Sequence, residues 1–325
     1  MLRLLVAVIA AVAGLMPAST FVVAQENVRF IYPVQIHTAS MAALPEYVGK
    51  YGVKLEVTQM RRYADIQLAL TTNQADVAVL GYINLGLMEE KGFHNQKAVA
   101  GVFLGGQSLT LRRGVTAKTW KDLEGKSLGT APNSYAELLF KSTAKLAGAD
   151  LSKIKTISFA SGGPPAQAAL RAGEIDGFVL WEPNNADAAV AGIGDYSTLD
   201  IGDNPTRHIN GAIVVNAEFA AKHRNAIVGL LRAVVESTNA LNADPARYAA
   251  IAQRETGSSA DVVKMAIPHG TLDYKLYQKE TGALLKMIYE AGITKVDTSP
   301  AAAQMLDYSY LMEATGKSKQ ELGGE

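Results

Sequence analysis

The chain has 325 residues, of which 48% are hydrophobic and 19% charged, and its 31 basic and 31 acidic residues give a net charge of zero. This composition excludes a disordered chain and a collagen-like repeat, and the balanced charge argues against a protein dedicated to nucleic acid or acidic membranes. Because the chain contains no cysteine, disulfides, iron–sulfur clusters, thiolate zinc sites, cysteine catalysis and a lipid on an N-terminal cysteine are excluded as well.

Residues 1–24 have the layout of a cleaved secretory signal peptide. Arg3 supplies a positive start, residues 4–16 form an apolar run, and small residues precede a cleavage site after Ala24. The run is shorter than the roughly 18–20 residues that span a bilayer, although an uncleaved anchor is the alternative. Cleavage removes Arg3 and leaves a net charge of −1. The expected location is the periplasm.

Short apolar strands alternate with helical patterns as far as residue 216. Strands are expected at 29–35, 53–60, 76–80, 98–104, 109–112, 126–130, 154–159 and 177–181. Helices are expected among them at 41–51, 63–73, 83–91, 134–147 and 165–172. From about residue 217 the strands stop, and helices are expected at 217–223, 225–242, 245–255, 259–266 and 276–291, before a frayed polar tail at 317–325. The alternation predicts an α/β fold with parallel-rich sheets.

Two segments of the chain resemble each other at an offset of 100 residues. Residues 69–85 and 169–185 are identical at six of seventeen positions, and each reads as a helix end, an acidic residue, a buried strand and a loop. Chance, or the sequence pattern common to α/β proteins, could produce this similarity, but the pattern favours two similar lobes. Because ligands bind beyond the carboxyl ends of strands in open α/β sheets, the loops at Gly81 and Trp181 are expected to face each other across a cleft.

Three phrases resemble the solute-binding proteins of ABC importers, in the NMT1-like group that includes nitrate-, sulfonate-, taurine- and thiamine-pyrimidine-binding proteins. They are TWKDLEGKSLGTAPNSYAELLF at 119–140, AGEIDGFVLWEP at 172–183 and GAIVVNAEFAAKHRNAI at 211–227. The resemblance implies a type II periplasmic-binding fold, with two α/β lobes around a central cleft and a two-segment hinge. The crossings are expected near 112–117 and 211–217, which gives a first lobe of 28–114 plus 215–325 and a second lobe of 115–214.

The resemblance also implies a function. The protein would be a monomer that closes on a small organic solute and delivers it to a membrane permease, while a separate ATPase subunit uses ATP. It would need no catalytic residue and no cofactor. A sulfonate or taurine-like acid is favoured as the ligand, and an aromatic carboxylate or a thiamine pyrimidine precursor is the alternative. Pyrimidine-precursor synthases share the fold but carry a cysteine-rich motif that this chain lacks, and a signalling sensor is a further alternative.

Candidate ligand contacts lie where a helix follows a strand. Ser134 is placed to cap a helix start, which also suits an anion, and a purely structural cap is the alternative. The family has a Ser or Thr of the ligand site at this position, so the resemblance favours a ligand contact for Ser134 with its neighbours Asn133 and Tyr135. Ser161 and Gly162 lie in a glycine-rich turn that could present N–H groups to an anion or be an ordinary turn.

Trp181 and Glu182 form the second candidate group. Trp181 could cover an apolar, aromatic or cationic part of a ligand, and Glu182 could accept a hydrogen bond from an amine or amide. A core tryptophan and a solvated glutamate are the alternative. Gly81 and Tyr82 occupy the matching place in the first lobe, where a glycine lets a ligand approach the backbone, although Tyr82 could equally be a surface residue.

The loop after the first strand offers donors and acceptors at Gln35, His37 and Ser40. The five histidines of the chain are scattered without metal-like spacing, so neither His37 nor any other histidine is expected to bind a metal.

A last group precedes the expected return strand. Arg207 could pair bidentately with a carboxylate or sulfonate, and His208 and Asn210 lie beside it in the sequence. Arg61 and Arg62 are rival partners for an anion, and both could equally be solvated surface residues.

Overall fold

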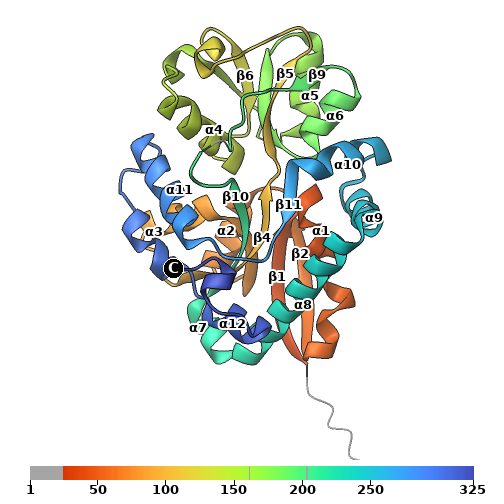
Figure 1. Cartoon of the computed structure of the whole chain (residues 1–325), viewed down its shortest axis with the longest axis vertical. Helices are drawn as coiled ribbons and strands as arrows, with labels where there is room; N and C mark the ends of the chain where they lie inside the picture. Colours follow the sequence, from red (N-terminus) through yellow and green to blue (C-terminus); the bar gives the residue numbers. More distant parts are fainter. Residues whose placement is uncertain (1–24, 161, 203) are drawn as a thin grey trace, which may run out of the picture.

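The computed structural model describes residues 25–160, 162–202 and 204–325. Two β-sheets organise these residues, and Figure 1 shows one sheet below the other. The first sheet has the strand order β11-β4-β10-β3-β1-β2, and the second has the order β7-β6-β8-β5-β9. The predicted signal peptide at 1–24 lies outside the described residues.

The first sheet is mixed. Its strands are β1 (Glu26–Pro33), β2 (Val53–Met60), β3 (Val77–Gly81), β4 (Gln96–Gly105), β10 (Ile209–Asn216) and β11 (Gly270–Leu272). β1 runs parallel to both β2 and β3, whereas β10 runs antiparallel between β3 and β4. Every residue of β3 is buried, which is why this strand reads as a continuous apolar run rather than an alternating one.

The second sheet is built in the same manner. Its strands are β5 (Gln107–Arg112), β6 (Ser127–Thr130), β7 (Lys155–Ser158), β8 (Gly177–Trp181) and β9 (Gly194–Tyr196). β6 runs parallel to β7 and β8, and β5 runs antiparallel to β8 and β9. Both sheets therefore have a parallel core flanked by an antiparallel strand.

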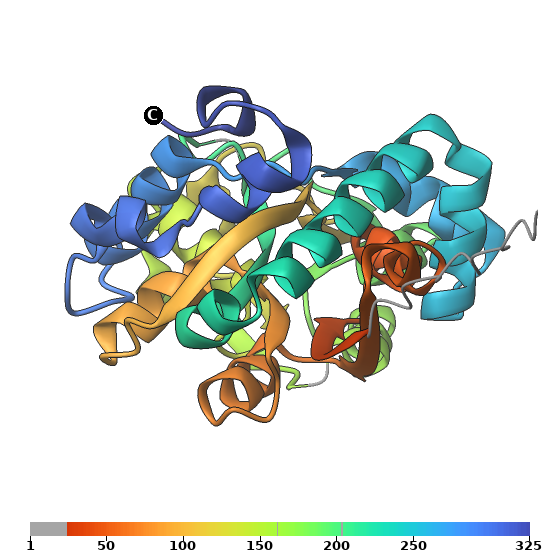
Figure 2. The same ribbon diagram turned by 90° about the horizontal axis from the view of Figure 1, so that it is seen from below.

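Helices cover both faces of the first sheet and the flanks of the second. In Figure 2 the blue α11 and the teal α8 lie on opposite sides of β4. The helices are α1 (Ala39–Ala42), α2 (Tyr63–Thr71), α3 (Tyr82–Glu90), α4 (Tyr135–Leu146), α5 (Gly163–Ala172), α6 (Asn184–Val190), α7 (Ala217–Lys222), α8 (Arg224–Ala243), α9 (Pro245–Thr256), α10 (Ala260–Ala266), α11 (Gln278–Glu290) and α12 (Ser309–Thr315). Within the described part of the chain, no helix combines the length and apolar character that a membrane span requires.

The chain crosses between the sheets earlier than the sequence suggested. β4 belongs to the first sheet and β5 to the second, so the first crossing is at Gly106 rather than at 112–117. Gly105 and Gly106 have φ angles of 72° and 83°, a left-handed conformation that favours glycine. The return lies between β9 and β10, before the expected 211–217. A strand pattern predicts that 107–112 is extended but not which strand it pairs with, and this caused the error.

Three local expectations also differ from the structure. The expected helix at 41–51 is instead α1 and two short 3-10 turns, because Pro45 lacks the N–H that a continuous helix needs. The C-terminal part contains a strand, β11, which pairs with β4. The tail at 317–325 is docked rather than frayed, since Leu322 is fully buried and its carbonyl accepts a hydrogen bond from the N–H of Leu276 at 3.0 Å.

The two similar segments occupy equivalent places in the two sheets. Asp76 precedes β3 and accepts a hydrogen bond from the backbone N–H of Arg29 in the parallel strand β1 at 2.9 Å. Asp176 precedes β8 and accepts one from the N–H of Ser127 in the parallel strand β6, also at 2.9 Å. The shared aspartate therefore ties a central strand to its parallel neighbour in both sheets.

Candidate ligand-binding site

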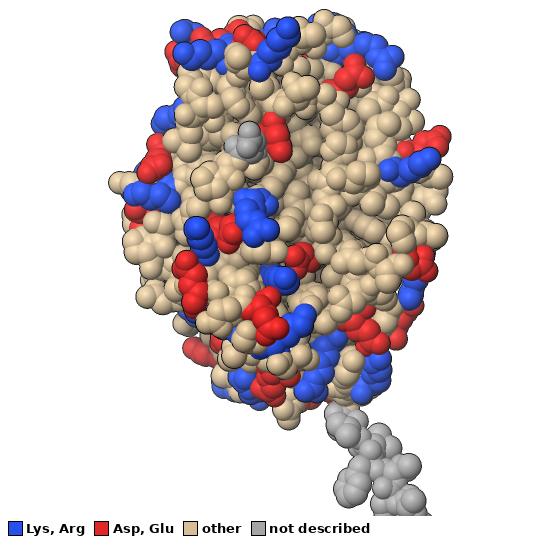
Figure 3. Space-filling model, viewed as in Figure 1, with Lys and Arg blue, Asp and Glu red and all other residues tan. Residues whose placement is uncertain are grey.

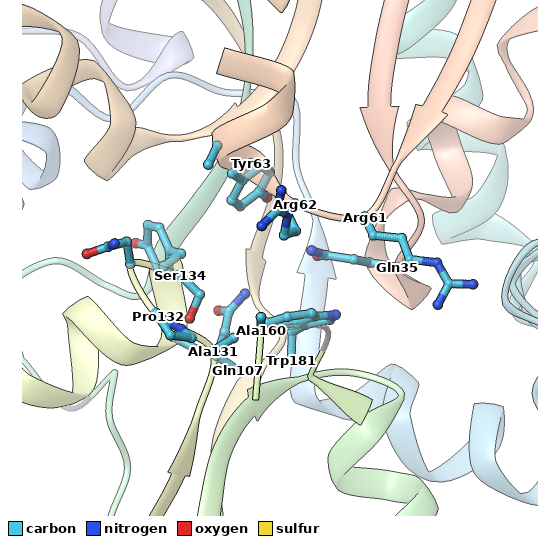
Figure 4. Close-up of a pocket in the computed structure, with 14 residues that line it drawn as sticks. Gln35, Arg61, Arg62, Tyr63, Gln107, Ala131, Pro132, Ser134, Ala160 and Trp181 are labelled. Carbon is cyan, nitrogen blue, oxygen red and sulfur yellow. The ribbon is translucent and has the colours of Figure 1, made fainter. Parts of the chain in front are cut away.

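A cavity of about 240 Å³ lies between the two sheets and takes walls from both. Figure 4 shows its lining: Gln35, Arg61, Arg62, Tyr63 and Ala64 from the first sheet's side, Ala131, Pro132, Asn133, Ser134, Tyr135, Ala136, Ala160 and Trp181 from the second, and Gln107 beside the crossing. These residues lie at or just beyond the carboxyl ends of β1, β2, β6, β7 and β8. That is where open α/β sheets bind their ligands.

Helix α4 begins at the cavity wall. Ser134 is its N-cap, and its Oγ accepts a hydrogen bond from the N–H of Glu137 at 3.2 Å. The Glu137 carboxylate accepts from the N–H of Asn133, the residue before the cap, at 2.7 Å, whereas the N–H of Ser134 itself donates to the carbonyl of Ala131 at 3.1 Å. The N–H groups of Tyr135 and Ala136 lie in the first turn, where a helix offers no acceptor of its own. They remain available to an acceptor in the cavity.

Helix α2 begins at the opposite wall. Tyr63 and Ala64 are its first two residues, and both line the cavity. Two helix N-termini, one from each sheet's side, thus converge on the same space and make it favourable for negative charge. Arg62 is engaged by Asp65 through two hydrogen bonds of 2.8 and 2.7 Å. The guanidinium of Arg61 points away from the centre of the cavity in Figure 4.

Two buried polar atoms at the cavity lack protein partners among the described residues. They are Oε1 of Gln107, a residue that is only 3% exposed, and the hydroxyl of Tyr63. Burial raises the pKa of Tyr63, which keeps its hydroxyl protonated. Leaving such atoms unpaired costs about 1–3 kcal/mol each. A ligand that pairs with them would recover that cost.

Trp181 forms the floor of the cavity in Figure 4, with its ring lying flat beneath the open space. Gly162 lies behind this ring rather than in the lining. It has a φ of 61°, and a Cβ added there would come within 3.1 Å of the Trp181 ring. The absence of a side chain at Gly162 therefore leaves room for the indole ring. The candidate Ser161 lies outside the described residues.

Glu182 does not face the cavity. It is 1% exposed, and its carboxylate accepts hydrogen bonds from the Tyr196 hydroxyl at 2.7 Å and from the N–H of Ala186 at 3.1 Å. Successive residues of a strand point to opposite sides, so the side chain after Trp181 turns away from the ligand space. Burial raises the pKa of the Glu182 carboxyl to about 7.

Several candidates are structural residues of the first sheet's side. His37 is buried against Phe103 and its Nε2 lies 3.2 Å from the carbonyl of Ile267, and burial lowers its pKa to about 4. Ser40 is fully buried in α1. The hydroxyl of buried Tyr82 donates to the carbonyl of Lys275 at 3.4 Å. None of the three candidates lines the cavity.

The remaining candidates lie near the crossings. A Cβ at Gly81 would come within 2.7 Å of the Tyr135 ring, so this glycine makes room for that ring, whose hydroxyl donates to the carbonyl of Ile209. The amide of fully buried Asn210 donates to the carbonyl of Gly105 at 2.7 Å, which ties the two crossings together.

Arg207 and His208 lie on the segment that returns to the first sheet. A guanidinium nitrogen of Arg207 is 3.6 Å from the carboxylate of Glu280 on α11, and the group lies over the Tyr277 ring. His208 lines a separate hollow that includes His269, and burial lowers its pKa. Neither residue reaches the cavity.

The structure therefore brings together Gln35, Asn133, Ser134, Tyr135 and Trp181 of the predicted set, along with the rival arginines Arg61 and Arg62. Sequence reasoning missed Tyr63 and Gln107. The glycine pair at 105–106 could have drawn attention to Gln107, because two adjacent glycines commonly mark a change of chain direction. Tyr63 gave no such signal, since an aromatic residue at a helix start reads as ordinary packing.

The comparisons with known proteins agree with this architecture. The profile of the NMT1-like family matches residues 23–255, so the chain belongs to that family and the resemblance found in the sequence is confirmed. No curated protein sequence matches the chain.

Solved structures show the fold. The ligand-binding component of an ABC-type import system from Staphylococcus aureus, with zinc bound, is 18% identical with a TM-score of 0.74, over 90% of this chain and 100% of that one. The alkanesulfonate-binding protein SsuA from Xanthomonas axonopodis pv. citri, bound to MOPS, is 17% identical with a TM-score of 0.71, over 86% of this chain and 98% of that one. The periplasmic nitrate-binding protein NrtA from Synechocystis PCC 6803 is 14% identical with a TM-score of 0.76, over 90% of this chain and 89% of that one. The expected α/β periplasmic-binding fold is confirmed.

Proposed function

We propose that this protein is the solute-binding subunit of an ABC importer and captures a small organic anion in the cavity between the sheets. The observation that carries the proposal is the convergence of the N-termini of α2 and α4 on one cavity that also holds two unpartnered buried polar atoms. Its volume of about 240 Å³ is below the 300–1,000 Å³ typical of pockets for drug-sized ligands. A small solute therefore fits best.

Binding works through closure of two lobes. Each lobe is one sheet with its helices, and the crossings at residue 106 and at 197–208 form the hinge. The ligand is bound between α4 and Trp181 of one lobe and α2 and Gln35 of the other, so it favours the closed arrangement over the open one. A membrane permease recognises the closed protein. The protein itself breaks no bond, and it acts as a monomer.

A ligand screen tests this proposal. Organic sulfonates and carboxylates are added to the purified protein in a thermal unfolding assay, and hits are measured by calorimetry. A ligand at 100 times its dissociation constant adds about 2.7 kcal/mol to the unfolding free energy. Trp181→Ala should weaken the binding of the best ligand more than tenfold. The control is Trp120→Phe, which alters the tryptophan packed on Phe140 and should bind the ligand as the unaltered protein does. A panel without a single hit, or equal affinity for Trp181→Ala, would contradict the proposal.

The proposed location has its own test. A periplasmic protein must be exported, and residues 1–24 would be its cleaved signal. Mass spectrometry of material from the periplasm should show Gln25 as the first residue, whereas retention of residues 1–24 would contradict the signal peptide.

A further inference from the structure

Among the residues that the structure describes, no carboxylate lines the cavity. None of its fourteen lining residues is Asp or Glu. The acids nearest in the sequence are engaged elsewhere: Asp65 pairs with Arg62, Glu137 accepts hydrogen bonds from the hydroxyl of Thr130 and the N–H of Asn133, and Glu182 faces Tyr196. A ligand ammonium enclosed here could donate to the unpaired Oε1 of Gln107, but it would lose its water shell without gaining an opposite charge, which is costly.

Small apolar residues make up part of the lining. Four alanines at positions 64, 131, 136 and 160 and the ring of Pro132 present no long side chain to the cavity. Their small size leaves the space above the Trp181 ring open (Figure 4). A flat ring favours an offset face or edge contact with another ring. An aromatic ligand body therefore suits this floor better than a branched or strongly polar one.

Hydrogen-bond donors face the same cavity from two opposite walls. The Ser134 hydroxyl and the free N–H groups of α4 lie at one wall, and the N-terminus of α2 with the Tyr63 hydroxyl lies at the opposite wall. These groups donate hydrogen bonds, so an anionic head group is matched there. The cavity thus offers donors at its walls to the acid group of a ligand and the face of the Trp181 ring to the body of the ligand.

We infer that the ligand is a small aromatic acid, a sulfonate or carboxylate with a flat apolar body, and that a ligand ammonium group is selected against. This inference rests on the proposed function and narrows it. It removes taurine-like amino sulfonates from the candidates, because Glu182, the one residue expected to receive an amine, points away from the cavity.

Three sulfonates test the inference by calorimetry. Ethanesulfonate and taurine differ only by the ammonium group, and ethanesulfonate should bind at least tenfold more tightly. Benzenesulfonate should bind at least tenfold more tightly than ethanesulfonate because its ring covers Trp181. Taurine binding as tightly as ethanesulfonate, or ethanesulfonate as tightly as benzenesulfonate, would overturn the inference while leaving the proposed function intact. If none of the three binds but an aromatic carboxylate such as benzoate does, the inference holds for the carboxylate; if no acid binds, the proposed function fails.

A designed carboxylate gives the matched variant. Gln107→Glu places an acid of nearly the same shape at the cavity wall, and it should weaken benzenesulfonate at least tenfold and shift the preference of the site toward taurine. Gln35→Glu places a carboxylate at the cavity from the other lobe. It is the variant to use if circular dichroism shows that Gln107→Glu does not fold. Unchanged relative affinities in a folded variant would overturn the inference, since they would show that carboxylates near this cavity do not control ammonium selection.

Discussion

Trp181 and Glu182 are adjacent in the chain but lie in different environments. Trp181 is the floor of the cavity, whereas Glu182 is buried against Tyr196 and the start of α6. An isolated buried carboxylate is costly, and two hydrogen bonds offset that cost only in part, as the raised pKa of about 7 shows. Glu182 is therefore a structural residue whose charge depends on pH near neutrality.

This environment predicts a pH-dependent stability. The folded protein holds the Glu182 proton more tightly than the unfolded chain, whose ordinary pKa is 4.5. The stabilisation is fully present below pH 4.5 and is lost as the pH rises through about 7, amounting to about 3 kcal/mol. Glu182→Gln keeps the shape without the titration, so its unfolding free energy should lack this decline.

Urea unfolding at pH 5 and pH 8 measures the difference. Asp187, whose pKa is also raised by burial, raises the pKa of Glu182 by repulsion, so the difference between the two proteins reports Glu182 together with that repulsion. Parallel pH profiles for the unaltered protein and Glu182→Gln would show that Glu182 does not titrate in the folded state.

The two arginines at the cavity should contribute differently to the binding of an anion. Arg62 is neutralised by Asp65, whereas exposed Arg61 has no ion pair among the residues that the structure describes. Arg61→Ala should lower the affinity for an anion about two- to threefold at low salt and have no effect at high salt, because exposed charges are screened. Arg171→Ala, which removes an exposed arginine on α5, is the control in calorimetry at two salt concentrations. A salt-independent loss above tenfold would instead indicate direct contact by Arg61.

At the scale of elements, α4 serves both stability and binding through its first turn. Ser134→Ala should lower the unfolding free energy by about 1 kcal/mol and also weaken the ligand, because the hydroxyl donor at the cavity is removed. Ser259→Ala is a matched control, since Ser259 caps α10 through the N–H of Val262 at 3.4 Å and does not line the cavity. Chemical unfolding and calorimetry on both variants separate the two effects. Equal ligand affinity in the two variants would assign Ser134 to capping alone.

The elements also show what local sequence predicts. β2 at 53–60 and β8 at 177–181 have the expected bounds, because apolar alternation and buried runs are local signals. The helix expected at 41–51 failed because a single Pro45 outweighed the apolar period around it. β11 has only three residues and exists because β4 offers it an edge. Pairing between strands that are distant in the sequence produces no recognisable pattern in a short segment. Neither β11 nor the crossing at Gly106 could therefore be predicted.

The same reasoning explains the site. Residues at the end of a strand or at the start of the next helix, such as Trp181 and Ser134, could be found because ligands bind at the carboxyl ends of strands in this fold class. Which side a residue faces after that end, as for Glu182, depends on the exact end of the strand. Gln107 enters the site only because the chain changes sheets beside it, which is a property of the whole topology.

At the scale of the whole molecule, contacts between the lobes lie on both flanks of the cavity. α4 contacts α11, where Lys145 donates to the carbonyl of Ala291 at 2.8 Å, and α6 contacts α10. The Tyr196 ring stacks on His269 with centroids 3.8 Å apart. Basic and acidic side chains alternate over the face shown in Figure 3, consistent with the neutral composition. The two sheets with their helices thus meet through a few specific side-chain and backbone contacts.

Arg207, in the proposed hinge segment, lies against Glu280 on α11, and the coupling of these two residues tests whether this contact supports closure. The Arg207 side chain is 64% exposed, so the pair stabilises the closed form by at most about 1 kcal/mol. Because apparent affinity scales with the closed fraction, Arg207→Ala and Glu280→Gln should each weaken ligand binding by up to about fivefold. The double variant should lose no more than either single one, since both remove the same interaction.

The double-mutant cycle distinguishes this role from ligand contact. If Arg207 bound the acid directly, Arg207→Ala would lose more than tenfold while Glu280→Gln would be neutral. Small-angle scattering gives an independent measure: the unaltered protein should become more compact when ligand is added, and Arg207→Ala should reach the same compact form at a higher ligand concentration. Reaching a different final dimension would mean that the pair shapes the closed form rather than only its population.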